Sequence, residues 1–151
     1  MLDIYNKQDL TERLNNLKVD SQPVFGKMSA QHVIEHLAIT FMISNGKLPR
    51  QLVTPPEKVA RYKAVFFEPD KEFPSGIKAP VLGDEPLPLR YPDLPSAIQK
   101  FWKEFDAFET YYAENPDSKP MHPVIGELDK EEWVLFHNKH VTHHFKQHGL
   151  V

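Results

Sequence analysis

The sequence contains no cysteine among its 151 residues. This absence excludes disulfide bonds, thiolate metal ligands and a cysteine nucleophile, but it says little about the compartment in which the protein works. The sequence also lacks an apolar run of about 18 residues and a signal-peptide pattern, so we expect no membrane span and a cytoplasmic protein. Glycine is scarce, with six residues, whereas proline is plentiful, with fourteen.

An excess of positive charge is missing as well. The 18 Lys and Arg residues face 21 Asp and Glu residues, which gives a net charge of −3, and no long basic run occurs. Neither nucleic acid nor an anionic membrane surface is therefore an expected partner. The length and the hydrophobic content of 40% are typical of one globular domain, which we expect to span residues 1–151.

Four segments have the apolar spacing of amphipathic helices. Their capping residues and helix stops predict helices near residues 7–18, 29–45, 95–114 and 130–147. Each apolar stripe needs a partner surface, and one shared core satisfies all four stripes. The sequence therefore predicts an all-α fold, a four-helix bundle with a long connection between the second and third helices.

That connection, residues 48–92, holds nine of the fourteen prolines and has helical character only near residues 57–66. Proline restricts the backbone, so we expect an ordered, extended strap rather than a free linker. The strap either roofs a functional site and offers Arg61, Tyr62 or Arg90 to a substrate, or serves only as the connection that the topology requires.

Histidine is dense near the C-terminus, where five of the eight histidines fall within residues 137–148. His140 and His144 are four residues apart on the helix expected at 130–147, and they share the face that carries Trp133. Neutral imidazole is the commonest protein ligand for zinc and similar metals. The pair indicates a metal site, although surface or polar core histidines bonded to other groups remain the alternative.

Two ligands are too few, because a catalytic zinc site normally has three protein ligands and one open position. The best third ligand is His36, at the edge of the apolar stripe expected at 29–45. A half-buried histidine bonded to a neighbour would also suit this position. His32 lies farther toward solvent, and His143 falls outside the stripe of His140 and His144, so we expect it to be solvated.

Other polar residues have supporting roles in this interpretation. His137 and His148 flank the ligand stripe and are candidates for hydrogen bonds to the ligands or for proton transfer. His122 precedes Pro123 in a turn, where we expect a structural or supporting role. Glu35 is adjacent to His36, and neighbouring helical residues point about 100° apart, so Glu35 should face away from the site. No catalytic residue can be named from the sequence.

The two histidine-bearing segments resemble those of the DinB-like superfamily. These bacterial proteins are four-helix bundles in which a histidine of the second helix and an H-x-x-x-H pair of the last helix bind a divalent metal. Their last helix often reads H-x-x-x-H-R-G-Q, and residues 140–147 here read HVTHHFKQ, with Phe and Lys in place of Arg and Gly. The segment GKMSAQHVIEHLA and the C-terminal pattern His-His-x-Lys-Gln-x-Gly resemble one bacterial subfamily whose members have no assigned reaction.

The resemblance implies a divalent metal held by His36, His140 and His144, and an all-imidazole donor set favours zinc or nickel. A metal with open positions can activate water for hydrolysis or hold a thiol for transfer, and the superfamily includes bacillithiol transferases and mycothiol-dependent isomerases. The partner is then a small molecule such as a low-molecular-weight thiol, and a homodimer is compatible with the sequence. The alternative is a non-catalytic module that binds a small molecule or a metal.

Overall fold

A computed structural model describes residues 1–73 and 85–151, which are mostly helical. In chain order the elements are α1 (Lys7–Asn16), α2 (Ala30–Ser44), α3 (Pro56–Phe66), α4 (Leu94–Glu114), β1 (Met121–His122), β2 (Gly126–Glu127) and α5 (Lys130–Gln147). The two strands pair antiparallel. The predicted all-α class is confirmed, and the four predicted helices differ from the observed ones by at most two residues at an end. The sequence did not predict the small hairpin.

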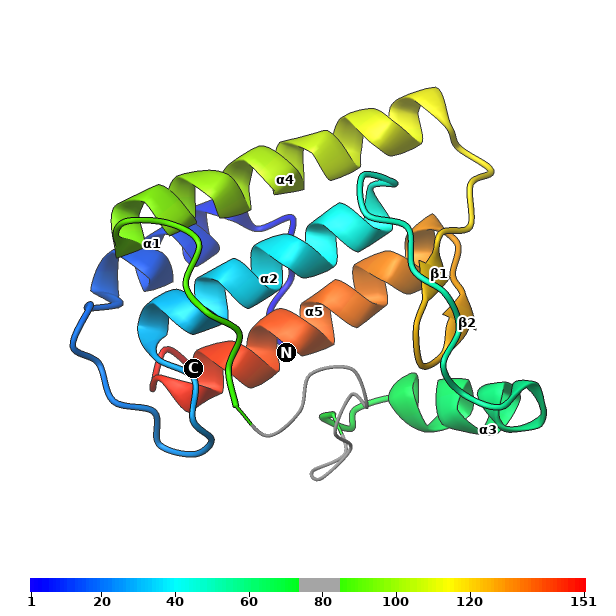
Figure 1. Ribbon diagram of the computed structural model, residues 1–151, viewed down its shortest axis with the longest axis horizontal. Helices are drawn as coiled ribbons and strands as arrows, with labels where there is room; N and C mark the ends of the chain where they lie inside the picture. Colours follow the sequence, from blue (N-terminus) through cyan, green and yellow to red (C-terminus); the bar gives the residue numbers. More distant parts are fainter. Residues whose placement is uncertain (74–84) are drawn as a thin grey trace.

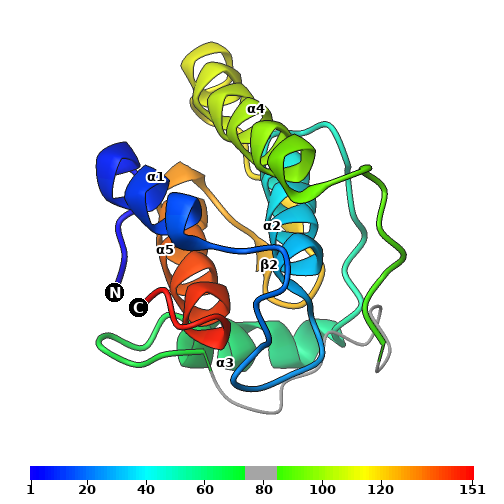
Figure 2. The same ribbon diagram turned by 90° about the vertical axis from the view of Figure 1, so that its left-hand side faces the viewer.

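The helices α2, α4 and α5 lie side by side, with α1 beside α5 (Figures 1 and 2). Both α2 and α4 begin at the left of Figure 1 and run in the same direction, whereas α5 returns antiparallel to them. The connection that contains α3 leads from the end of α2 back to the start of α4. Its length therefore allows these two neighbouring helices to be parallel.

Side chains define where the long helices begin. The Ser29 hydroxyl accepts the backbone N–H of His32, and the His32 imidazole in turn bonds to Ser29, which closes a reciprocal cap at the start of α2. Asp129 and Glu132 form the same kind of cap at the start of α5, as the sequence predicts. These caps satisfy backbone N–H groups that have no partner inside the helix, and so they fix where both histidine-bearing helices start.

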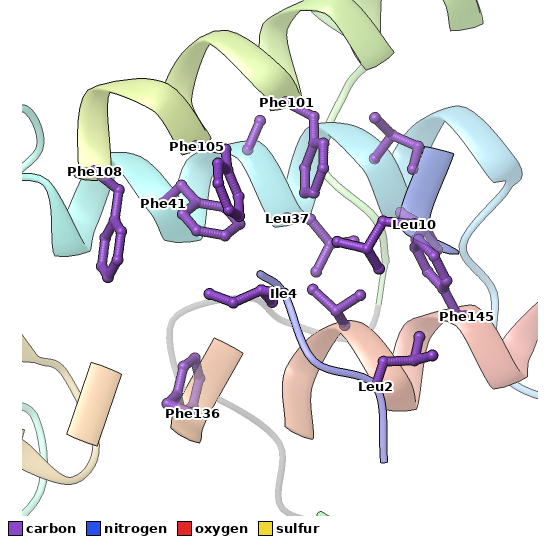
Figure 3. Close-up of a cluster of buried hydrophobic side chains, with 14 of the residues drawn as sticks. Leu2, Ile4, Leu10, Leu37, Phe41, Phe101, Phe105, Phe108, Phe136 and Phe145 are labelled. Atoms are coloured by element: carbon purple, nitrogen blue, oxygen red, sulfur yellow. The ribbon is translucent and has the colours of Figure 1, made fainter. Parts of the chain in front are cut away.

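Aromatic side chains fill the interface between α2 and α4. Phe41 of α2 is fully buried, and its ring centroid lies 5.3–5.7 Å from three phenylalanine rings of α4, those of Phe101, Phe105 and Phe108. Leu2 and Ile4 add to this core from the N-terminal segment, which the sequence did not predict (Figure 3). The bundle thus has a large apolar core of its own.

The described parts of the long connection are tied to the bundle. On one side of residues 74–84, the buried Lys139 ammonium donates to the carbonyl oxygens of Glu68 and Lys71 at 2.7 and 2.9 Å. On the other side, Gln31 and Glu35 of α2 bond to the backbone of residues 90–91. These bonds agree with an ordered strap on both sides of residues 74–84, which lie outside the described residues. Arg61 and Arg90 are exposed and Tyr62 is half-buried, so their contact with a substrate stays a prediction.

In the described ranges, 1–73 and 85–151, no helix combines the length and the apolar character needed to cross a membrane.

Candidate metal centre

Three imidazoles converge between α2 and α5. The Nε2 atom of His140 lies 2.9 Å from Nε2 of His36 and 3.0 Å from Nε2 of His144. One ligand nitrogen from each residue lies within 4.8 Å of the other two. The structure therefore brings together the three residues that the sequence singled out, and we call them the three-histidine cluster. This cluster is able to hold a metal ion.

The helices explain this convergence. His140 and His144 are one turn apart on α5, so both side chains project from the same face. His36 projects toward them from α2, where its ring centroid lies 4.8 Å from that of His140 and 4.7 Å from that of His144. Because α2 and α5 each belong to the packed bundle, the relative positions of the three rings are set by rigid elements rather than by loops.

Gln147 orients one of the three rings. Its buried side-chain oxygen, Oε1, accepts a hydrogen bond of 2.6 Å from Nδ1 of His144. The neutral His144 ring therefore carries its proton on Nδ1 and presents a lone pair at Nε2, toward the centre of the cluster. Histidines that bind metals usually donate their other N–H to such a partner. Gln147 matches the last residue of the H-x-x-x-H-R-G-Q pattern, but that match did not by itself reveal this bond.

Burial keeps the cluster uncharged. Removal from water, followed by the charge of the nearby His143, lowers the pKa of His36 to about 4. Burial, followed by the proximity of the other imidazoles, holds the pKa values of His140 and His144 well below the ordinary value for histidine. Neutral imidazoles are the form that binds a metal, so the environment favours the binding-competent state.

Hydrogen bonds alone satisfy the three rings poorly. The single Nε2 atom of His140 faces two other nitrogens, one of which, in His144, presents a lone pair. Nδ1 of His140 is buried and has no hydrogen-bond partner among the described residues. If Nε2 of His140 donates, its Nδ1 is an unpaired acceptor; if it does not, two lone pairs meet at 3.0 Å. A cation at the centre would remove the clash at Nε2, because all three lone pairs could then point to it; Nδ1 of His140 would carry the ring proton and would be the one group left without a partner among the described residues.

The spacing also suits a metal. Ligand nitrogens about 2.0–2.1 Å from a tetrahedral zinc ion lie about 3.3 Å from one another. The two short separations, 2.9 and 3.0 Å, are within a few tenths of an ångström of that value, and all three nitrogens lie within 4.8 Å of one another. The residues present therefore fit a divalent ion with three imidazole ligands.

His137 and His148, which the sequence suggested as hydrogen-bond partners of the ligands, make their hydrogen bonds to other groups. This finding corrects the sequence interpretation. His137 shares a hydrogen bond of 2.8 Å between its Nε2 and the Ser44 hydroxyl, and it stacks on Phe41 with ring centroids 3.9 Å apart. His148 bonds through its two nitrogens to the Ser21 hydroxyl and to the Met28 carbonyl. These bonds engage neither residue with the three-histidine cluster, and they give both a structural role.

His122 has the structural role expected of it. Its Nδ1 accepts the backbone N–H groups of Val124 and Ile125 at 3.1 and 3.3 Å, inside the turn of the hairpin. Burial lowers the pKa of His122 to about 3, so the ring stays neutral and remains an acceptor. Glu35 also lies as expected, since its carboxylate bonds to Gln31 and to the backbone of Arg90, away from the three-histidine cluster.

The structure also corrects the sequence interpretation of His143. We expected a solvated side chain, but the His143 ring is half-buried. Its centroid lies 5.6 Å from that of Phe25 and 6.0 Å from that of Phe73, and 5.0 Å from that of His144. Helical position alone could not show this burial, because both phenylalanines come from segments outside α5.

Comparison with known proteins assigns the chain to a family. A family model described as "Protein of unknown function (DUF1569)" matches residues 1–148, and the chain belongs to that family. No curated protein and no solved structure matches the chain.

Proposed function

We propose that the protein is a divalent-metal-dependent enzyme in which His36, His140 and His144 hold zinc or nickel. The ion would keep a coordination position open for a small molecule, and the reaction would be hydrolysis or thiol transfer. The convergence of the three Nε2 atoms at 2.9 and 3.0 Å carries this proposal. Among the described residues no carboxylate joins the cluster, and the sequence has no cysteine, which favours zinc or nickel over harder ions such as magnesium.

The number of ligands found among the described residues supports an open site. Structural zinc sites usually close the coordination sphere with four protein ligands, whereas catalytic sites have three and a free position. A bound divalent ion would acidify a water molecule or a thiol and would polarise a carbonyl oxygen. The protein's own contribution is to hold three neutral imidazoles in place, to orient His144 through Gln147, and to bury the rings of His140 and His144.

The likeness to the DinB-like superfamily supports the same proposal. In that superfamily an equivalent set of one plus two histidines binds a metal between the second and last helices. Here His36 lies on α2, and His140 and His144 lie on the last helix, α5. The thiol-dependent members of the superfamily make low-molecular-weight thiols the first substrates to test.

The test uses untagged protein loaded with zinc or nickel. Ester hydrolysis is measured with p-nitrophenyl acetate, and thiol transfer is measured with a chlorinated electrophile and a panel of small thiols. We expect metal-dependent turnover that a His140→Ala/His144→Ala variant loses by at least about a hundredfold. His32→Gln is the matched control, because Gln at this position can keep the cap at the start of α2.

Turnover that is equal in wild type and in the double variant would overturn the assignment of the site. If the protein binds metal and small molecules but turns over none of them, the proposal that it is an enzyme is contradicted. That result would support a non-catalytic binding module instead.

A further inference from the structure

Two phenylalanines flank His143. Phe25 belongs to the loop between α1 and α2, and Phe73 ends the described part of the strap that follows α3. The centroids of their rings lie 5.6 and 6.0 Å from that of His143. We call Phe25, Phe73 and His143 the aromatic rim. Because its members come from three separate segments, this rim exists only in the folded protein.

The aromatic rim adjoins the three-histidine cluster. The Phe73 ring centroid lies 5.7 Å from that of His140, and the His143 ring centroid lies 5.0 Å from that of His144. These are ordinary distances between interacting rings. An organic group attached to a molecule bound at the cluster would therefore be within reach of the rim.

Phe25 is 45% exposed, yet its loop is firmly held. The backbone N–H of Val24 donates to the carbonyl oxygen of Gln147 at 2.7 Å. His148 bonds to Ser21 before Phe25 and to Met28 after it, both at 3.0 Å. A single exposed apolar side chain is common and needs no explanation. An exposed ring on a loop bonded on both sides, and facing a histidine beside the cluster, is a more specific arrangement.

Gly26 shows how closely this loop fits the site. Its backbone has a φ of +78°, a conformation that favours glycine, and a Cβ atom here would lie 2.8 Å from Nε2 of Gln147. The loop that carries Phe25 therefore packs directly on the residue that orients His144. Phe25 is therefore adjacent in the chain to a residue that packs against a partner of the cluster.

We propose that the aromatic rim binds an apolar, preferably aromatic, group of the molecule whose polar end reaches the three-histidine cluster. This inference rests on the proposed function and names the substrate class of the same site. A flat ring would cover exposed apolar surface of Phe25 and would pack against the rings of His143 and Phe73. Small, fully hydrophilic thiols or esters would gain nothing from these contacts.

Cobalt-loaded, untagged protein tests the inference, because a thiolate bound to cobalt gives a charge-transfer band. The band is titrated with benzyl mercaptan and with 2-mercaptoethanol, whose thiols have similar acidity. We expect benzyl mercaptan to bind about tenfold more tightly, as one aromatic contact and its buried area allow. Phe25→Ala should remove most of this preference while changing the Kd of 2-mercaptoethanol by less than about twofold.

Two control variants show whether the effect of Phe25→Ala comes from loss of the aromatic ring. Phe25→Tyr keeps the ring and should keep the preference, and Val24→Ala removes a side chain that is 77% exposed in the same loop and should also keep it. Equal Kd values for the two thiols in the wild type, or an unchanged preference in Phe25→Ala, would overturn this inference alone. A protein that binds neither cobalt nor either thiol would overturn the proposed function, and the inference with it.

Discussion

Replacing Gln147 by Leu should weaken metal binding although Gln147 is not a ligand. The buried Gln147 oxygen accepts the Nδ1–H of His144 at 2.6 Å, so Leu would leave that N–H without a partner. An unpaired buried donor costs about 1–3 kcal/mol, and loss of such a ligand's partner usually lowers metal affinity by about 10–100-fold. We expect the Kd for zinc to rise within that range, while His144→Ala should raise it further.

Gly26→Ala should reproduce part of this effect from outside the site. The added Cβ would lie 2.8 Å from Nε2 of Gln147 and would push its side chain away from His144. Gly149→Ala is the matched control, since Gly149 has a similar φ of +65° but an added Cβ meets nothing within 4 Å. Both variants carry a backbone strain of about 1–2 kcal/mol, so only their difference reports the contact with Gln147.

Competition with a chromogenic chelator measures the zinc Kd of each untagged variant, and circular dichroism confirms that each one is folded. If Gln147→Leu binds zinc as tightly as the wild type while His144→Ala does not, the argument that Gln147 orients the ring is refuted. If Gly26→Ala and Gly149→Ala weaken zinc binding equally, the contact between Gly26 and Gln147 has no effect on the metal site.

Three further predictions concern stability. Chelation should leave the helical circular dichroism spectrum unchanged, because the core around Phe41 does not depend on the three-histidine cluster; global unfolding would make the metal structural. Phe41→Ala should lower the free energy of unfolding by about 3–5 kcal/mol in urea titrations, whereas a change below about 1 kcal/mol would contradict the packing described. The pKa of His122 is about 3 in the folded protein against 6.5 ordinarily, so below pH 6.5 the unfolded chain takes up a proton that the folded protein does not. Stability should therefore fall by about 1.4 kcal/mol per pH unit from this residue, and His122→Asn, which can still accept the two N–H groups, should show a shallower fall in urea titrations between pH 6 and about 4; an equal slope would refute this.

Local signals account for the parts of the fold that the sequence predicts. The caps at Ser29 and Asp129 and the periodic apolar residues act within a few positions along the chain, so the helices could be located closely. The two-residue strands of the hairpin are too short to show any periodicity. The burial of Leu2 and Ile4 depends on bonds to Thr142 and Asn138, far away in the sequence.

In the candidate site, too, local signals could be predicted from the sequence and long-range contacts could not. Helical spacing places His140 and His144 on one face, and His36 was identified by its position at the edge of a stripe. The spacing of His144 and Gln147, three residues apart on one helix, is a signal that could have predicted their hydrogen bond. The burial of His143 could not be predicted, because it depends on Phe25 and Phe73, which reach it only through tertiary structure.

Metal analysis shows whether the three-histidine cluster holds an ion. The protein must be untagged, because a histidine tag would itself collect nickel. Wild type and the His140→Ala/His144→Ala variant are purified in parallel, exposed to equal amounts of zinc and nickel, desalted and analysed by plasma mass spectrometry. We expect about one equivalent of zinc or nickel per wild-type chain and almost none in the variant. Equal metal content in the two proteins would contradict the claim that the three-histidine cluster is the metal site.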